Sequence, residues 1–332
     1  MKKLLIKLKE KKEFLNYHFR PLAKEGSNKE FYRLSKKKGP ESSILMLAND
    51  KDKAKGTLKD WIQIAKALTS VGVRIPKVQQ FFTEENAILM EDCQDTLLTD
   101  KLNELYSQQK LELIKQHYLS TLKLLKATQG LDSKLLKYTL GNKTLYNDLL
   151  FFYHEHIKKR ITEHSSFWNK DLFLEEAQSL SLYLNSLERT FTHRDFHSRN
   201  LLLSNNELVL IDFQDACLGP RAYDLISLTF DPYVLLPIEQ KKDLFSLGLE
   251  FIQEGLREKK RKELLDSWKA VAIQRLYKVL GSYNFLGAQK GKEKFLQHIK
   301  PTLGTLSQLD LFDSRWPYLT QKLKEGVISL EA

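Results

Sequence analysis

The stretch that begins at His193 carries the side chains of this sequence that are best suited to phosphoryl transfer. His193 and Asp195 form a His-x-Asp motif. Asn200 follows five positions after Asp195, and Asp212 comes after two short apolar runs. Phosphoryl transfer needs a carboxylate that meets the acceptor hydroxyl and oxygen ligands that hold Mg2+ on the phosphates. The ordered set therefore predicts a kinase-type site, with Asp195 as the catalytic residue and Asn200 and Asp212 as ligands of Mg2+.

A hairpin must bring these oxygen ligands together. The apolar runs Leu201–Leu203 and Leu208–Ile211 are separated by four polar residues, which is the pattern of two short strands joined by a turn. Because the second strand of a hairpin returns beside the first, we expect Asp212 to come back to Asn200 and to the loop that holds the catalytic carboxylate.

The remaining elements predict an α+β chain with two lobes. Strand and helix patterns alternate near the N-terminus: we predict a helix at 2–19, strands at 31–34 and 43–47, a helix at 58–71, and strands at 78–82 and 87–90. Later apolar spacing is helical: we predict helices at 111–128, 144–163, 172–188, 239–258, 262–285 and 292–307. We therefore expect a small β-rich nucleotide-binding lobe at 1–92 and a larger, mainly helical lobe at 93–332 for catalysis and acceptor binding.

Composition places the chain among ordinary globular proteins. Of its 332 residues, 42% are hydrophobic and 29% are charged, which excludes disordered and disulfide-scaffold classes. The two cysteines, Cys93 and Cys217, favour a reducing compartment. No apolar run approaches the roughly 20 residues of a membrane span, and the first apolar run is too short for a secretion signal. We expect a cytoplasmic protein with no membrane partner.

The net charge of +11 is concentrated in residues 1–40. Such an excess suits polyanions, but it is also typical of a solvated surface. The basic residues show no repeated interleaving with aromatic residues, so we expect no nucleic-acid partner. The charge also disfavours a polycationic substrate.

The chain resembles the aminoglycoside phosphotransferase and choline kinase superfamily, and most closely the bacterial anomeric sugar kinases. The segments that carry this resemblance are Ser27–Leu34, Thr192–Asn200, Asp212–Ala216, Gly219–Pro220, Tyr223–Leu225, Ser227–Leu228, Gln274–Arg275, Lys278–Gly281 and Gly291–Lys292. The resemblance covers about residues 15 to 310. It implies a bilobal protein-kinase-like fold and direct transfer of the γ-phosphoryl group of ATP to the anomeric hydroxyl of N-acetylmuramate or N-acetylglucosamine, in the recycling of cell-wall sugars.

The resemblance also implies roles for residues around the catalytic loop. Asp195 would orient the hydroxyl and take its proton, while Asn200 and Asp212 would hold Mg2+. His193 and Asp224 would be structural residues near the site, with Asp224 bracing the loop.

The nucleotide side departs from the protein-kinase pattern. Gly26 stands alone where those kinases carry three glycines, and Met46 occupies the position of the phosphate-pairing lysine. Backbone N–H groups can still cradle phosphate here. The residues that we expect to bind the nucleotide are Ser27, Asn28, Lys29, Arg33, Glu91 and Cys93, with Lys29 or Arg33 in place of the lysine and the main chain of Glu91 to Cys93 against the adenine.

A small molecule is favoured as the acceptor. Only ten residues lie between Asp212 and Tyr223, which leaves no room for a long activation segment and a peptide platform. From family pattern and residue type we predict that the acceptor meets Asp231, Tyr233, Arg275 and Lys278. An arginine or lysine suits the carboxylate of N-acetylmuramate.

Two alternatives stay open: a kinase for an aminoglycoside, choline or another sugar, and a nucleotide-binding module without activity. We expect a monomer.

Overall fold

The computed structural model describes residues 2–22, 29–37, 39–47, 58–94, 96–158 and 169–321. The chain forms two compact units, one of Met1–Leu98 with Asn200–Asp215 and one of Thr99–Arg199 with Ala216–Ala332. The hairpin after the catalytic loop thus belongs to the first unit. Across the described ranges, no helix is both long enough and apolar enough to cross a membrane. The functional division of the chain at residue 92 stays a prediction.

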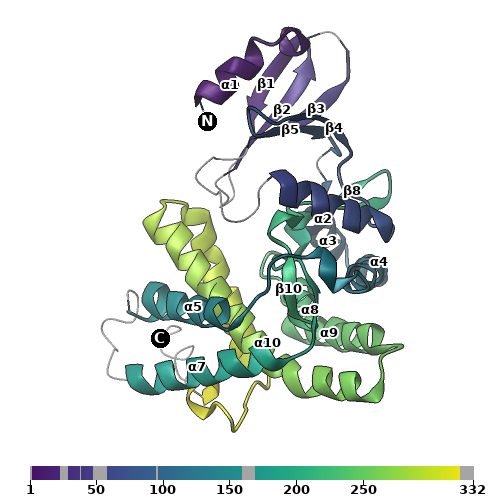
Figure 1. Cartoon of the computed structure of the whole chain (residues 1–332). Coiled ribbons are helices and arrows are strands. Elements are labelled where there is room, and N and C mark those ends of the chain that lie inside the picture. Colours follow the sequence, from purple (N-terminus) through teal and green to yellow (C-terminus); the bar gives the residue numbers. More distant parts are fainter. Residues whose placement is uncertain are drawn as a thin grey trace. The chain divides into compact units, whose positions relative to one another are not determined.

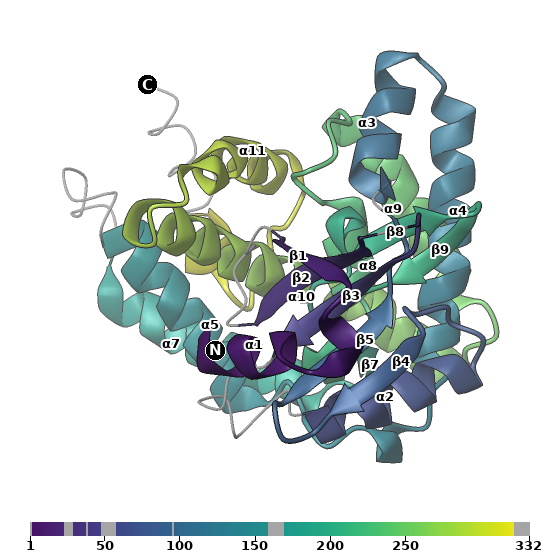
Figure 2. The same cartoon turned by 90° about the horizontal axis from the view of Figure 1, so that it is seen from above.

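The first unit contains a five-stranded antiparallel sheet in the order β1-β2-β3-β5-β4 (Figure 1). Its strands are β1 (Tyr17–Pro21), β2 (Glu30–Lys36), β3 (Ser42–Leu47), β4 (Val78–Phe82) and β5 (Ala87–Glu91). The helix α1 (Lys2–Lys9) and the short turn η1 (Lys12–Phe14) precede the sheet. Figure 2 shows α1 lying along the strands, and an apolar cluster joins them: Leu8, Phe14, Leu34, Leu45, Leu47, Phe82 and Ala87.

The predicted helix at 2–19 is wrong in its second half. Only Lys2–Lys9 is α-helical, and Tyr17–Pro21 is a strand that pairs with β2. Tyr17 and Phe19, two residues apart, both pack against the apolar cluster. That spacing is the period of a strand, which places alternate side chains on one face of the sheet.

The other predicted elements of this unit are confirmed. The loop between β2 and β3 contains Gly39 at a φ of +114°, and α2 (Leu58–Ser70) ends before Gly72 at a φ of +76°. Glycine adopts such angles without a Cβ clash. The strands at 78–82 and 87–91 also form where the pattern predicts them.

The catalytic-loop hairpin forms a second, three-stranded sheet in the first unit. Its strands are β6 (Thr96–Leu97), β8 (Leu201–Ser204) and β9 (Glu207–Leu210), in the order β6-β8-β9. The turn residues Asn205 and Asn206 both have a positive φ, which asparagine tolerates in tight hairpins. The ring of Trp61 in α2 lies 5.0 Å from that of Phe213, just after the hairpin. This packing ties the hairpin to α2.

The second unit is mainly helical and is organised around α10 (Glu258–Asn284). Every residue from Ala270 to Tyr277 is buried, because other helices cover this stretch on all sides. Figure 2 shows α5, α7 and α11 near α10. The remaining bounds of this unit are α3 (Leu98–Ser107), α4 (Leu111–Gln129), α5 (Asn142–Phe152), α7 (Lys170–Ser186), β7 (Arg189–Thr192), β10 (Cys217–Pro220), α8 (Tyr223–Thr229), α9 (Ile238–Gln253) and α11 (Ile299–Gln308).

Three predicted helices differ in their details. The helix expected at 239–258 is α9, which ends at Gln253, while Glu258 is the first residue of α10. The helix expected at 144–163 is α5 followed by a π-helical turn at Tyr153–Ile157, and residues 159–163 lie outside the described residues. The helix expected at 292–307 begins as a 3-10 segment, Glu293–His298, before α11. The helices α3 and α8 and the paired strands β7 and β10 were not predicted. All seven residues of α8 are buried, so it has no polar face that reveals helical spacing.

Candidate active site

A buried carboxylate at the start of α8 holds the loop that carries Asp195. Asp224, only 1% exposed, accepts hydrogen bonds from the backbone N–H of His193 at 2.6 Å and of Arg194 at 3.1 Å. Burial raises the pKa of Asp224 to about 6, against the lowering effect of His193 and of these two bonds. Arg194 has a φ of +75°, which costs free energy at a residue with a Cβ. The two bonds to Asp224 help to offset that cost.

The two histidines of the loop differ in their surroundings. His193 is 1% exposed and its ring contacts Phe196 edge to face at 6.0 Å, as a structural residue would. The ring of His197 lies 5.4 Å from that of Tyr233, and burial lowers the pKa of His197.

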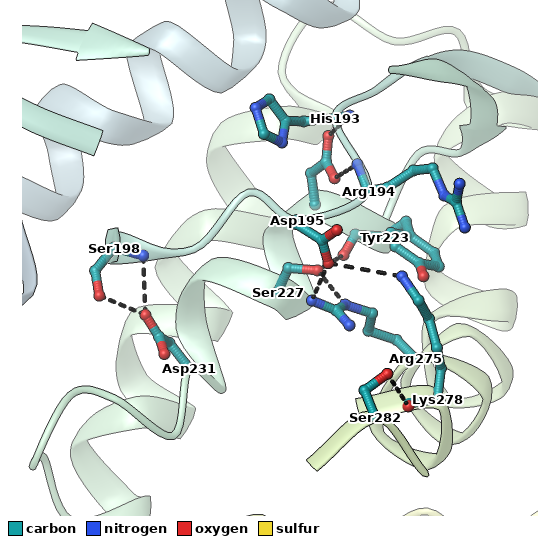
Figure 3. A network of polar contacts seen from close by, with 11 residues as sticks. His193, Arg194, Asp195, Ser198, Tyr223, Ser227, Asp231, Arg275, Lys278 and Ser282 are labelled. Carbon is teal, nitrogen blue, oxygen red and sulfur yellow. Dashed lines mark hydrogen bonds and ion pairs between the residues drawn. The ribbon is translucent and has the colours of Figure 1, made fainter. Parts of the chain in front are cut away.

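Asp195 faces two cations from α10, as Figure 3 shows. Its Oδ1 lies 3.2 Å from Nη2 of Arg275 and 3.6 Å from Nζ of Lys278, while the Asp195 side chain stays 46% exposed. Loss of water around the carboxylate would raise its pKa, but Lys278 and then Arg275 outweigh this effect and hold the pKa of Asp195 well below its usual range. Asp195 is therefore an ionised carboxylate that can accept a hydrogen bond or a proton.

Arg275 is the more tightly held of the two cations. It is 5% exposed, and its Nε donates to the Oγ of Ser227 at 2.6 Å. Its guanidinium lies 5.6 Å from the ring of Tyr223. The Lys278 side chain is 13% exposed, and burial lowers its pKa while Asp195 raises it. Lys278 makes an ion pair with Asp195 that is too long for a hydrogen bond.

Asp231, predicted to bind the acceptor, is engaged by the protein. It is 1% exposed and accepts from the backbone N–H of Ser198 at 2.9 Å, the Oγ of Ser198 at 2.5 Å and the backbone N–H of Tyr233 at 2.8 Å. Its backbone oxygen also accepts from Nζ of Lys241 at 2.6 Å. These bonds fasten the end of the catalytic loop to the turn that follows α8.

Tyr233 belongs to an aromatic group beside the catalytic loop. We call Tyr233, Tyr283, His298 and His197 the Tyr233 group. The ring of Tyr233 lies 4.5 Å from that of His298 and 6.1 Å from that of Tyr283, in edge-to-face contacts. The guanidinium of Arg199 lies 4.6 Å from the centre of the Tyr233 ring. Tyr233, His298 and His197 are half-buried, so this group presents ring surface within the second unit.

The predicted Mg2+ ligands Asn200 and Asp212 flank one end of the hairpin in the first unit. Leu201 pairs with Leu210, and the backbone N–H of Ile211 donates to the backbone oxygen of Asn200 at 3.1 Å. Asp212 has a φ of +58°, and its Oδ1 accepts from the side-chain amide of Gln214 at 2.6 Å. An amide oxygen and a carboxylate are hard ligands of the kind that Mg2+ takes, so the residues present fit this ion. The approach of Asp195 to these two residues stays a prediction.

On the nucleotide side, Arg33 contacts the protein's own Asp92. Its Nε lies 2.6 Å from Oδ2 of Asp92 and its Nη2 donates to Oδ1 at 3.0 Å. Ser42 also donates to Asp92, at 2.7 Å. The Arg33 guanidinium thus braces the end of β5 in this structure. A contact between Arg33 and phosphate stays a prediction.

The expected adenine-binding segment follows β5. Glu91 accepts from Nη2 of Arg74 at 3.0 Å and from the backbone N–H of Lys77 at 3.1 Å. Cys93 is 4% exposed, and burial, followed by Glu91, raises the pKa of its thiol to about 11. The side chains of Glu91 and Cys93 are therefore engaged within the fold, and the contact of this segment's main chain with adenine stays a prediction.

Of the other residues considered for nucleotide binding, the structure describes only some. Ser27 and Asn28 lie outside the described residues. Lys29 lies directly before β2. Met46 is 3% exposed in β3, where its side chain packs in the interior. The assignment of Met46 to the position of the phosphate-pairing lysine stays a prediction.

Sequence reasoning missed four residues that shape the site. Ser227 and Tyr223 anchor Arg275, while Arg74 links β5 to the hairpin through Glu207 at 3.1 Å. The side-chain amide of Asn103 in α3 donates to the backbone oxygen of Tyr233 at 3.0 Å. Tyr223 and Ser227 lie in segments that carry the family resemblance, and Ser227 follows Asp224 by about one helical turn; neither signal assigned them a contact with Arg275. Nothing in the sequence pairs Arg74 or Asn103 with its distant partner.

The chain belongs to the phosphotransferase enzyme family, whose model matches residues 18–245. Membership in this family makes it a small-molecule kinase, and ATP is the phosphoryl donor expected throughout such kinases. The predicted family is thereby confirmed.

A curated relative and two solved structures resemble the chain. The N-acetylmuramate/N-acetylglucosamine kinase of Neisseria meningitidis is 26% identical over 271 residues, 81% of this chain and 79% of the relative. The ethanolamine kinase of Plasmodium vivax has a TM-score of 0.60 at 16% identity and covers 91% of this chain and 85% of its own. The ADP-bound aminoglycoside phosphotransferase APH(2'')-Ib has a TM-score of 0.57 at 15% identity, with 91% and 97% covered. These likenesses confirm the predicted α+β fold of the kinase type.

Proposed function

We propose that this protein transfers the γ-phosphoryl group of ATP to the anomeric hydroxyl of N-acetylmuramate, N-acetylglucosamine or both. The observation that carries the proposal is the position of the Asp195 carboxylate in the catalytic loop, beside Arg275 and Lys278. The choice of sugar is supported by the similarity to the Neisseria N-acetylmuramate/N-acetylglucosamine kinase. Such a reaction would serve cell-wall sugar recycling in the cytoplasm, where ATP is available.

In this mechanism Asp195 accepts a hydrogen bond from the anomeric hydroxyl, orients it towards the phosphorus and takes its proton as the new bond forms. An anomeric hydroxyl is more acidic than an ordinary alcohol, so the weakly basic Asp195 suffices and orientation supplies much of the rate. Asn200 and Asp212 would hold Mg2+, which when bound neutralises charge on the phosphates.

The acceptor would lie against the Tyr233 group. Sugars present C–H faces that pack on aromatic rings, and Tyr233 offers half-buried ring surface close to His197, two residues after Asp195. Lys278 supplies a positive charge for the carboxylate of N-acetylmuramate. Of the four residues predicted to meet the acceptor, we keep Tyr233 and Lys278 in that role. Asp231 and Arg275 are committed to protein partners.

A choline-type acceptor is the second candidate, because aromatic rings also bind quaternary ammonium groups. The rings of Tyr233 and Tyr283 support it. Against it stands the guanidinium of Arg199, which already lies over the Tyr233 ring at 4.6 Å and would repel a cation.

For the nucleotide, we propose that main-chain groups from Glu91 to Cys93 meet adenine. Ser27, Asn28 and Lys29 would meet the phosphates, and Arg33 would do so only if it leaves Asp92. We expect the enzyme to act as a monomer.

The proposal is tested by an assay of ADP release with Mg-ATP and five acceptors: N-acetylmuramate, N-acetylglucosamine, glucosamine, choline and kanamycin. Asp195→Asn serves as the blank. Turnover with the N-acetylated sugars, giving a phosphate that is labile to mild acid, would support the anomeric reaction. Turnover only with kanamycin or choline would overturn the proposed acceptor.

A further inference from the structure

We propose that Arg275 is a positioning residue for Asp195, whose carboxylate it fixes from α10 in one orientation. The proposal rests on the proposed function only in taking Asp195 as the carboxylate that meets the acceptor. It does not depend on which acceptor is used.

The guanidinium of Arg275 is held on three sides. Nη2 donates to Oδ1 of Asp195 at 3.2 Å, Nε donates to the Oγ of Ser227 at 2.6 Å, and the group lies over the ring of Tyr223 (Figure 3). Ser227 in turn donates to the backbone oxygen of Tyr223 at 3.0 Å. Because Arg275 is 5% exposed, this arrangement leaves it little freedom to turn towards a ligand.

Asp195 needs such a support. Its side chain is 46% exposed, so packing alone does not select its rotamer. The backbone of the loop is fixed separately, through Asp224 and the N–H groups of His193 and Arg194. Arg275 therefore adds what Asp224 does not supply, a fixed direction for the carboxylate itself. Misplacement of a reacting group by about 1 Å can cost roughly 100-fold in rate.

The charges around Asp195 come from three elements. Arg275 and Lys278 face it from α10, Arg194 and His197 from its own loop, and Tyr223 from α8. The cations together hold the pKa of Asp195 below its usual range, against the loss of water around it. Lys278 lies at 3.6 Å and is more exposed than Arg275, so it attracts the carboxylate without fixing its direction.

The test measures kcat and KM against pH for four variants. Arg275→Gln removes the positive charge. Arg275→Lys keeps the charge but lacks the several N–H donors of the guanidinium. Ser227→Ala removes only the hydroxyl that accepts from Nε of Arg275. Lys269→Gln is the matched control, because Lys269 also lies on α10 and pairs with an aspartate, Asp310, at 2.9 Å. Thermal unfolding and ADP binding are measured for each.

We expect Arg275→Gln to lower kcat by about 10- to 100-fold with little change in KM for ATP. Asp195 must be ionised to act, so loss of the neighbouring cation moves the acidic limb of the kcat profile to higher pH. Arg275→Lys should return the acidic limb of the kcat profile to its wild-type pH but restore only part of kcat. Ser227→Ala should lower kcat a fewfold.

The proposal is overturned if Ser227→Ala and the folded Arg275 variants match Lys269→Gln in kcat and in the acidic limb. It is also overturned if Asp195→Asn retains wild-type turnover, because Asp195 is then not catalytic. If the N-acetylated sugars fail and another acceptor is turned over, the same comparison is made with that acceptor. The sugar assignment then falls, while the outcome for Arg275 is decided independently.

Discussion

Asp231 accepts hydrogen bonds from both the backbone N–H and the hydroxyl of Ser198, at 2.9 and 2.5 Å. The Ser198 hydroxyl also lies 2.5 Å from that of Thr99, at the start of α3. A buried carboxylate after α8 therefore fastens the end of the catalytic loop. The loop has two such fastenings, since Asp224 holds its beginning.

We predict that Asp231→Asn destabilises the protein by about 1–3 kcal/mol, because the new amide group would face donors that now meet a carboxylate oxygen. The measurement is the midpoint of thermal unfolding, together with KM for the acceptor. Asp243→Asn, an exposed position on α9, is the control. An unchanged midpoint with a raised acceptor KM would instead favour the acceptor-binding role that residue type suggests.

Apolar spacing and turn residues predicted those elements whose formation depends on neighbouring residues in the sequence. The strand pairs of the first unit, the hairpin after the catalytic loop and the long helices follow from apolar spacing and turn residues. The strand Tyr17–Pro21 was not predicted, because it forms only through pairing with β2 and the apolar residues before it continue a helical spacing. Likewise α8 is buried all round and shows no period.

The candidate site divides in the same way. The His-x-Asp motif places Asp195 in the sequence, but its support by a residue 80 positions later depends on how α10 packs. Residue type predicted that Arg275 would meet an anionic ligand. The structure gives it an anionic partner within the protein, because a buried guanidinium needs a counter-charge. Asp231 likewise has partners within the protein, since a buried carboxylate is satisfied by nearby N–H groups; its contact with the acceptor stays a prediction.

We predict that Asp195→Asn lowers kcat by about 100- to 10,000-fold, the range of a general base, while ADP binding stays within about twofold of wild type. The amide is nearly isosteric, but it cannot take a proton from the acceptor. Steady-state turnover and calorimetric titration with ADP measure the two effects, again beside Asp243→Asn. Wild-type turnover of Asp195→Asn would remove Asp195 from the mechanism.

We predict that Tyr233→Ala raises KM for the acceptor by about fivefold, since loss of an aromatic contact costs on the order of 1 kcal/mol. KM for ATP should not move. Tyr233→Phe should behave as wild type if the ring face is what binds the sugar. Tyr106→Ala on α3 removes a half-buried tyrosine outside the Tyr233 group and serves as control. Equal acceptor KM values for the two alanine variants would exclude Tyr233 from the acceptor site.

We predict that removal of divalent cations with EDTA abolishes turnover and that Mg2+ restores it. Asp212→Asn should raise the Mg2+ concentration needed for half-maximal turnover by about tenfold or more, because an amide is a weaker ligand than a carboxylate. The experiment is a Mg2+ titration of turnover at saturating ATP. Glu207→Gln is the matched control: Glu207 lies at the opposite end of the same hairpin, where it pairs with Arg74. If both variants need the same Mg2+ concentration as wild type, the charge of Asp212 does not serve the metal, and its contact with Gln214 is its main role.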